Sequence, residues 1–235
     1  MSEVLFDWGR NGVRHLAPRC AALVVVDVLS FSTAVDIATT AAARVLPLPM
    51  SGPDAAAAAQ DAGAVLAGPR SRESWSLSPS SLRSVPAGLL LALPSPNGAT
   101  LCAEAAELGV AVLVGCLRNA GALAAAAAAA AGAGQVGVIA AGERWGVVSG
   151  PLRPAVEDLL GAGAIISALP GARSPEAEVA AAAHAAVADR LEPLLLDCES
   201  GAELRELGFA DDVRLAAEAD VSGAAPALRA GALEA

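Results

Sequence analysis

Four acidic side chains follow apolar or glycine-rich stretches, where a carboxylate could bind a metal ion or move a proton. Asp27 comes directly after the apolar run ALVVV, and Glu143 lies in the loop GERWG. Glu157 and Asp158 open a predicted helix. A buried carboxylate is costly unless it is paired or bound to a metal, and hard oxygen ligands suit Mg²⁺. We therefore expect Asp27, Glu157 and Asp158 to bind Mg²⁺, and we expect Asp27 and Glu143 to be catalytic.

Ordinary structural roles are the alternative for these carboxylates. Asp27 could cap the helix that follows it or pair with an arginine. Glu157 and Asp158 lie in a first helical turn, where acidic residues commonly interact with the helix dipole. Adjacent helical positions point about 100° apart, so one of the two faces a cleft more easily than the other.

Polar and basic residues that could hold an anionic substrate also follow apolar runs. Asn97–Gly98 and Arg118–Asn119 each precede a predicted helix, and the first backbone N–H groups of a helix bind anions well. An arginine can hold a phosphate or sulfonate with two hydrogen bonds, although Arg118 could also be a surface residue at a helix start. The candidate substrate-binding residues are Ser32, Thr33, Asn97, Gly98, Arg118, Asn119 and Arg144.

The histidines and cysteines indicate structural rather than catalytic roles. His15 lies in an N-terminal segment that looks mobile, and His184 lies in the middle of a helix among alanines. The four cysteines show no CxxC spacing, so we expect reduced and mostly buried thiols. Cys116 directly follows a strand but lacks the CxxxxxR loop of cysteine-dependent phosphatases, so a thiolate nucleophile there is a minor alternative.

The elements that must position these residues alternate between strands and helices. Apolar runs predict strands at about 21–28, 44–48 and 64–68, and two further strand–turn–helix units follow. This order predicts an α/β fold with three layers, α/β/α, around a mainly parallel or mixed sheet. Ligands of such sheets bind at the carboxyl ends of the strands, so the polar residues that follow the strands are expected to share one cleft. We expect a single domain over 1–235, with two lobes at about 1–90 and 91–235 as the alternative.

The composition restricts the class of partner. The 235-residue chain has a formal net charge of −10 and a pI of about 4.6, which argues against a nucleic-acid or anionic-membrane partner. No stretch reaches the roughly 18 apolar residues that span a bilayer. The N-terminus lacks the charged-then-apolar order of a signal peptide, so we expect a cytoplasmic protein.

Five segments, taken in order, resemble one protein family. VVVDVLSFSTAV resembles the VVIDVLRASTT segment of the 2-phosphosulfolactate phosphatase family, SPNGAT its TTNGT, and GCLRNA its G-(S/C)-x-x-N-A segment. AAGERWG…EDLLGAGAIISAL is similar to the family's AG…(E)D…AG block. Residues 198–228 resemble its ending, SxxGxxLxxxGxxxDVxxAxxxDxxxxVPxL. The resemblance runs from about residue 20 to 229, nearly the whole chain.

The resemblance implies a Mg²⁺-dependent hydrolase that converts 2-phosphosulfolactate to sulfolactate and phosphate during coenzyme M biosynthesis. The small phosphorylated substrate would meet the positions that match family motifs, which are Asp27, Ser32, Thr33, Asn97, Gly98, Asn119, Glu157 and Asp158. The chain departs from the family at Ser30, Pro69, Ser76, Pro79 and Ala99, and so lacks an arginine and a carboxylate expected at the cleft. Arg70, Arg72 or Arg144 is the candidate replacement for the cation.

Two other classes of function stay open beside the hydrolase. The departures at Ser30, Ser76 and Pro79 favour a catalytically impaired homologue that binds a small anion. The alanine-rich helices, such as GALAAAAAAAAGAG, would suit an oligomer face, so a homo-oligomeric interaction protein is the third hypothesis.

Overall fold

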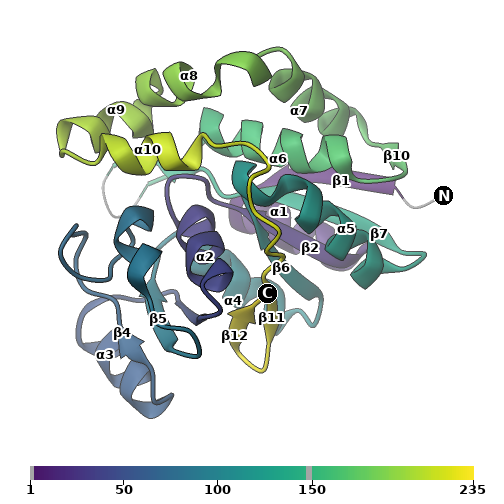
Figure 1. The fold of residues 1–235 in the computed structure, drawn as a ribbon. Coiled ribbons are helices and arrows are strands. Elements are labelled where there is room, and N and C mark those ends of the chain that lie inside the picture. Colours follow the sequence, from purple (N-terminus) through teal and green to yellow (C-terminus); the bar gives the residue numbers. More distant parts are fainter. Residues whose placement is uncertain (1–2, 147–149) are drawn as a thin grey trace.

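A mixed, mostly parallel sheet organises the computed structural model, which describes residues 3–146 and 150–235. Over these residues the main sheet has ten strands in the order β10-β1-β7-β2-β6-β11-β12-β3-β5-β4, and β8 and β9 form a separate hairpin (Figure 1). Neighbouring strands run parallel except at β11 and β12, which pair antiparallel with β6, with each other and with β3. The strands are β1 (Glu3–Trp8), β2 (Cys20–Val26), β3 (Arg44–Leu48), β4 (Val65–Leu66), β5 (Leu90–Pro94), β6 (Ala111–Gly115), β7 (Gln135–Ala140), β8 (Glu143–Arg144), β9 (Leu152–Arg153), β10 (Ala172–Arg173), β11 (Ala227–Arg229) and β12 (Ala232–Glu234).

The helices connect the parallel strands and then continue as a C-terminal group. They are α1 (Gly9–Leu16), α2 (Phe31–Thr40), α3 (Gly52–Asp61), α4 (Gly98–Glu107), α5 (Ala120–Ala131), α6 (Val156–Ala168), α7 (Pro175–Ala185), α8 (Leu191–Asp197), α9 (Glu199–Glu206) and α10 (Ala210–Ala216). Three 3₁₀ turns are η1 (Pro79–Ser84), η2 (Leu117–Asn119) and η3 (Ala188–Arg190). Within the described part of the chain, no helix is long and apolar enough to cross a membrane.

Helices cover both faces of the sheet, which confirms the predicted three-layer α/β fold (Figure 1). The central strand β2 shows the reason. Ala22, Val24 and Val26 pack in the core formed with α5, α6 and α7, whereas Leu23 and Val25 pack in the core formed with α1, α2 and α4. Successive strand residues point to opposite faces, so a strand covered on both sides reads as one continuous apolar run.

The N-terminal segment is a strand and a helix, and the expectation that it is mobile is wrong. β1 pairs in parallel with β7 on one side and with β10 on the other, and Val4 and Leu5 are buried. Val13 and Leu16 bury one side of α1. The segment looks unstructured in the sequence because its apolar runs are short and interrupted by polar residues. β1 is stabilised by pairing with strands that lie more than 130 residues away along the chain.

A C-terminal hairpin lies in the middle of the sheet, and the sequence did not predict it. β11 contacts β6 through the pair Ala227 and Leu113, and β12 contacts β3 through Leu233 and Val45. The hairpin therefore lies between the strands β6 and β3 and joins them into one sheet. Because β11 and β12 have three residues each, neither gives a clear periodic signal.

Candidate active site

Asp27 lies at the carboxyl end of β2, where the chain turns into α2, and it is buried. Its Oδ2 accepts a hydrogen bond from the backbone N–H of Gly98 at 2.8 Å, and its Oδ1 accepts a longer one from Phe31 at 3.4 Å. A Cβ at Gly98 would lie 2.3 Å from the Phe31 ring and 2.8 Å from Asp27 Oδ2, so glycine is needed for this close approach. The first N–H group of α4, expected to bind substrate, is therefore used by Asp27.

The protonation of Asp27 reflects its surroundings. Burial raises the pKa of Asp27 to about 6, against the opposing effect of its hydrogen bonds with backbone N–H groups. The negative charges of Glu143 and Glu157 raise the pKa further. Asp27 therefore lies in a cluster of like charges, and a cation beside it would favour its ionised form.

Asp158 joins the ends of two neighbouring strands. It projects from the first turn of α6, and its Oδ1 accepts the backbone N–H of Val28 at 2.7 Å while its Oδ2 accepts that of Gly142 at 2.8 Å. Burial raises the pKa of Asp158 well above its ordinary value, and the charges of Asp27 and Glu157 add to the shift. Both oxygens of Asp158 accept short backbone hydrogen bonds, whereas Asp27 Oδ1 accepts only a long one of 3.4 Å from the described residues, so Asp158 mainly fixes the positions of the residues around it.

Glu143 and Glu157 complete a carboxylate cluster, which we define as Asp27, Glu143, Glu157 and Asp158. Glu143 Oε1 accepts hydrogen bonds from Asn97 Nδ2 at 2.8 Å and from the N–H of Arg144 at 3.1 Å. Glu157 is buried, and the thiol of Cys198 donates to its Oε2 at 3.5 Å. The strand ends at Asp27, Asn97–Gly98 and Gly142–Glu143 thus meet at the start of α6, as a shared cleft requires.

The hydroxyl groups of Ser32 and Thr33 shape the turn that holds Asp27. Ser32 Oγ accepts the backbone N–H of Asp27 at 2.8 Å, and Thr33 Oγ1 donates to the carbonyl of Val28 at 2.8 Å. Both residues are buried. Their contacts with the β2–α2 turn favour a structural role over direct contact with substrate.

Arg118 and Asn119 make their described contacts with residues outside the carboxylate cluster. Arg118 donates from Nε to Asp36 at 2.8 Å and from Nη1 to the Leu215 carbonyl at 3.1 Å, and it also pairs with Glu218. Asn119 accepts the N–H of Cys116 at 2.9 Å and donates to the carbonyl of Ala224 at 3.1 Å. These bonds attach the C-terminal segment to the end of β6, so we leave both residues out of the proposed substrate site.

The cysteines are free and buried, as the sequence indicated. Burial raises the pKa of Cys116 to about 12, and the charge of Asp36 adds to this shift. Burial likewise raises the pKa of Cys198 to about 12. Neither thiol is poised to act as a thiolate near neutral pH, which disfavours a cysteine nucleophile.

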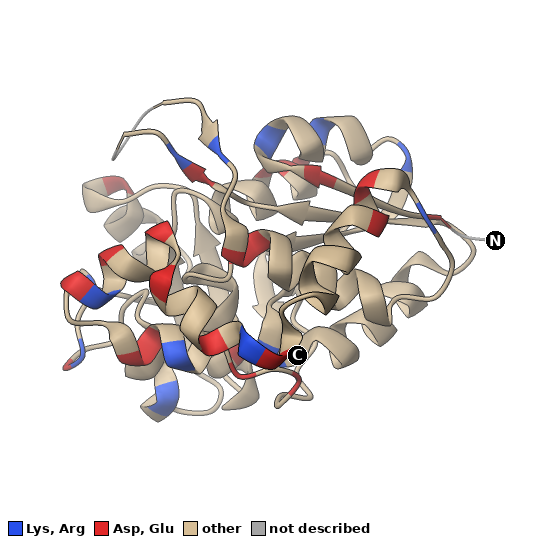
Figure 2. Ribbon diagram, turned by 90° about the horizontal axis from the view of Figure 1, so that it is seen from above, with Lys and Arg blue, Asp and Glu red and all other residues tan. Residues whose placement is uncertain are grey.

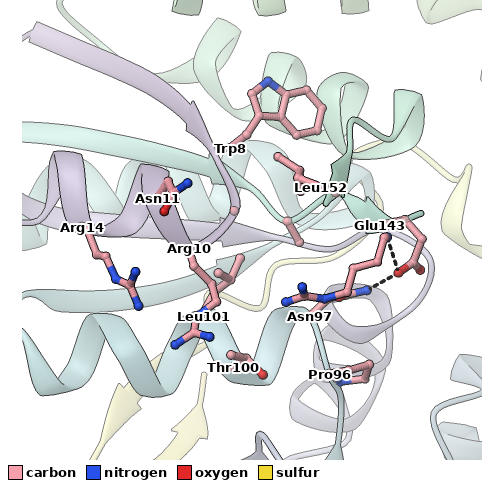
Figure 3. Close-up of a pocket in the computed structure, with 14 residues that line it drawn as sticks. Trp8, Arg10, Asn11, Arg14, Pro96, Asn97, Thr100, Leu101, Glu143 and Leu152 are labelled. Carbon is pink, nitrogen blue, oxygen red and sulfur yellow. Dashed lines mark hydrogen bonds between the residues drawn. The ribbon is translucent and has the colours of Figure 1, made fainter. Parts of the chain in front are cut away.

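A pocket of about 290 Å³ adjoins the cluster through Asn97, Gly142 and Glu143. Figure 3 shows Arg10 and Arg14 pointing from α1 toward α4, where both pair with Glu104. The basic segments of α1 and of the β8–β9 hairpin also lie on the same side of the view in Figure 2. The lining residues that carry polar groups are Arg10, Asn11, Arg14, Asn97, Thr100, Glu143 and Arg144. Arg10, Asn11 and Arg14 were not predicted because residues 3–16 carry no clear periodic pattern, and Thr100, inside the helix that begins at Gly98, was not predicted either.

The irregular stretch 69–86 brings Arg70 to the turn beside Asp27. Arg70 Nη2 donates to Ser30 Oγ at 3.0 Å, and its Nη1 pairs with Asp212 Oδ2 at 3.0 Å. Burial lowers the pKa of Arg70, while the charges of Asp212 and Asp27 oppose that shift. Arg70 thus contacts Ser30, the position at which the family resemblance implies an arginine that this chain lacks.

The donor set of the carboxylate cluster fits a magnesium ion. Its members offer hard oxygen ligands. Burial raises the pKa of Asp27 most, and the negative charges of Glu143 and Glu157, which a divalent cation would balance, raise it further. No three Asp, Glu, His or Cys side chains among residues 3–146 and 150–235 are arranged to hold an ion by themselves. The arrangement therefore suits an ion held by one or two carboxylates together with water and substrate oxygens, as is usual for Mg²⁺.

Comparison with known families gives a match that covers most of the chain. The profile of the 2-phosphosulpholactate phosphatase family matches residues 12–231, which include the whole carboxylate cluster and Arg70. No curated protein sequence matches the chain.

Proposed function

The chain belongs to the 2-phosphosulpholactate (2-phosphosulfolactate) phosphatase family and is a phosphoric monoester hydrolase, and we propose that it acts at the carboxylate cluster. The reaction of the family takes 2-phosphosulfolactate and water to sulfolactate and phosphate. The convergence of Asp27, Glu143 and Glu157 at the ends of three chain segments is the observation that carries the assignment of the site. Convergence of carboxylates around a buried group whose pKa is raised, as that of Asp27 is, is typical of functional sites.

Mg²⁺ is the cofactor in this proposal, with Asp27 and Glu157 as the residues that hold it. When bound, Mg²⁺ polarises a phosphate oxygen and orients the reacting groups. Asp158 has a different role, because its two oxygens accept the N–H groups of Val28 and Gly142. It keeps the end of β2 and the end of β7 at a fixed separation, and so keeps Asp27 and Glu143 facing one site.

Glu143 is the residue that we assign as general base. Its described hydrogen bonds, from Asn97 and from the N–H of Arg144, both go to Oε1. The Oε2 atom is therefore the one that would accept a proton from the attacking water. Glu143 also lines the pocket, whereas Asp27 is buried and is not one of the described lining residues, so Glu143 is better placed to meet water.

The pocket beside the cluster binds the non-reacting anionic end of the substrate in this proposal. Arg10, Arg14 and Arg144 line it, and Asn97 lies at its border with the cluster. Three arginines around one pocket are notable in a chain of net charge −10. An arginine recognises carboxylate or sulfonate groups through two parallel hydrogen bonds, so the pocket suits a substrate with more than one negative group.

Phosphate release from 2-phosphosulfolactate, with Mg²⁺ and with a chelator, tests this proposal. We expect turnover with Mg²⁺ and its loss after chelation. An alkyl phosphate without a second anionic group should react with a much higher KM. Absence of phosphate release from a panel of small phosphoesters, with folded protein and Mg²⁺, would refute the site assignment and favour an anion-binding homologue. Full activity in the chelator would refute the role of the metal alone.

A further inference from the structure

Arg70 brings positive charge to the carboxylate cluster from a loop that the mechanism above does not use. Arg70 Nη2 donates to Ser30 Oγ at 3.0 Å, in the same β2–α2 turn that carries Asp27, and the charge of Asp27 opposes the lowering of the Arg70 pKa by burial. We propose that Arg70 binds the phosphoryl group of the substrate, and that Asp212 is the positioning residue that holds the Arg70 guanidinium in place. This inference rests on the proposed function of the cluster.

Asp212 is arranged to hold the loop that carries Arg70. Its side chain is 1% exposed, and it lies on α10, far along the chain from the loop. Its Oδ2 pairs with Arg70 Nη1 at 3.0 Å, and its Oδ1 accepts Ser78 Oγ at 2.8 Å and the N–H of Ser80 at 3.2 Å. A carboxylate buried to this extent needs such partners. The described partners all belong to the 69–86 stretch, so Asp212 fixes both the loop and its arginine.

Two further contacts set the direction of the guanidinium. Ser30 Oγ accepts from Arg70 Nη2 at 3.0 Å, and the Phe209 ring centroid lies 5.5 Å from Arg70 Cζ. Phe209 immediately precedes α10, so the aromatic contact and the ion pair with Asp212 come from one element. The Arg70 side chain nevertheless stays 21% exposed, which leaves it accessible to a ligand.

The remaining donors of Arg70 suit a phosphate. A guanidinium has five N–H groups, and the bonds to Asp212 and Ser30 use two of them. Charge-assisted hydrogen bonds from the others would match two oxygens of a phosphoryl group. Other arginines are engaged elsewhere: Arg118 is bonded to Asp36, and Arg153 donates to Ser200 Oγ at 3.2 Å.

The loop itself is held by a network of serine side chains, which gives the arginine a fixed base. Ser76 Oγ accepts the N–H groups of Ser71 at 3.0 Å and of Ser78 at 3.2 Å. Ser81 Oγ donates to the carbonyl of Ser78 at 2.7 Å. Ser76, where the resemblance implies a carboxylate of the cleft, therefore supports the loop that carries Arg70.

Chemical rescue tests the role of Arg70. We expect Arg70→Ala to lower kcat/KM by about 10²- to 10³-fold, the effect of removing a donor to transition-state charge. Millimolar guanidinium chloride should restore part of kcat, whereas sodium chloride at the same ionic strength should not. Arg83→Ala is the matched control, since Arg83 is an exposed arginine in η1. An Arg70→Ala variant with wild-type kcat/KM would overturn the proposal.

Asp212→Asn tests the positioning role, with Asp211→Asn as the control on the same helix. Asp211 is exposed and pairs with Arg214 at 2.8 Å, so its change should leave activity unaltered. Asp212→Asn should lower kcat about tenfold or more and weaken inhibition by inorganic phosphate. Should Asp212→Asn fail to fold, Ser30→Ala removes the other hold on Arg70 and should also weaken phosphate inhibition. A lower thermal midpoint with unchanged kcat and unchanged phosphate inhibition would show that Asp212 only fixes the loop.

Calorimetric titration with inorganic phosphate separates this inference from the proposed function. Wild-type protein that binds phosphate and releases it from a phosphoester supports the site, and weaker phosphate binding by Arg70→Ala then supports the inference. If wild-type protein turns over and Arg70→Ala binds phosphate equally well, only the inference fails. If wild-type protein neither binds nor releases phosphate, both fail.

Discussion

Two groups of largely buried charged side chains lie at the carboxyl ends of the parallel strands, and they differ in how their charges are balanced. Around Arg118, the guanidinium meets Asp36 and Glu218, so acidic and basic side chains are in direct contact. In the carboxylate cluster, Asp27 and Asp158 are instead held by backbone N–H groups, neither forms a direct ion pair with the described residues, and the charges of neighbouring carboxylates raise their pKa values beyond the effect of burial. The first group holds the C-terminal segment in place, and the second has negative charge to offer a ligand.

The difference shows how a buried carboxylate can be interpreted. Asp36 has a charged partner, although its Oδ1 has no hydrogen-bond partner among the described residues. Asp27 has backbone partners that keep it in place without neutralising it. Burial alone does not separate a structural carboxylate from a functional one. A direct ion pair with an arginine indicates a structural carboxylate. A buried carboxylate without such a partner indicates a functional one, because an unbalanced buried charge is retained only at a cost in stability.

Removing the charge of Asp27 should give the largest effect on activity. Asp27→Asn keeps an oxygen that can accept the Gly98 N–H, and we expect kcat/KM to fall by about 10³-fold. The thermal midpoint should stay the same or rise, because a buried charge among like charges is lost. Steady-state phosphate release and a thermal melt measure the two effects. Asp54→Asn, on the exposed α3, is the control, and an active Asp27→Asn variant would contradict the comparison.

Removing Arg118 should affect stability instead. Arg118→Met leaves Asp36 buried without its partner, so the free energy of unfolding should fall by about 3 kcal/mol. Urea denaturation measures this loss, and the double variant Arg118→Met/Asp36→Asn should recover part of it. We expect kcat/KM of the folded single variant to change by less than tenfold. A stable Arg118→Met variant with a greatly raised KM would instead restore Arg118 to the substrate site, as the sequence suggested.

The free energy of unfolding should depend on pH through Asp27 of the carboxylate cluster, which has among the described residues no direct ion pair of the kind that Asp36 forms with Arg118. The folded-state pKa of Asp27 is raised to about 6 from 3.8, so folded protein binds this proton more tightly than unfolded protein does. The contribution of Asp27 is fully present below pH 3.8 and is lost as the pH rises through 6. We therefore expect wild-type protein to lose about 2 kcal/mol relative to Asp27→Asn between pH 4 and 7. Parallel stability curves for the two proteins would contradict the assigned environment.

Addition of Mg²⁺ should give the smallest effect. An ion that binds the folded state at ten times its dissociation constant stabilises it by about 1.4 kcal/mol. We expect Mg²⁺ to raise the thermal midpoint of wild-type protein at pH 7.5 and to have little effect on Asp27→Asn. An equal shift in both proteins would mean that the ion binds outside the cluster.

The sequence was informative where a local pattern carries the meaning. An apolar run followed by a polar turn located Asp27, Asn97 and Glu143 at strand ends. Parallel pairing places the ends of β2 and β7 side by side, and hydrogen bonds join Asn97 and Gly98 to Glu143 and Asp27. A local sequence pattern does not predict the direction in which a side chain points. Arg118 follows β6 as expected, but Asp36 and the C-terminal segment determine where its guanidinium points.

Long-range contacts account for what the sequence did not predict. Arg70 lies 142 positions from Asp212, and no spacing rule connects them. Arg10 and Arg14 belong to a helix whose place depends on β1 pairing with β7. The glycine at position 98 is an intermediate case, since the sequence shows a helix start there but not the nearby carboxylate that excludes a side chain.

The hairpin β11–β12 has a consequence for biosynthesis. Strands β10, β1, β7, β2 and β6 lie on one side of it, and β3, β5 and β4 lie on the other. A ribosome must therefore release residues 227–234 before the two halves can join across it. Residues 227–234 are made after the other strands of this sheet and complete its middle, so their loss by proteolysis should damage the whole enzyme rather than only one edge of the sheet.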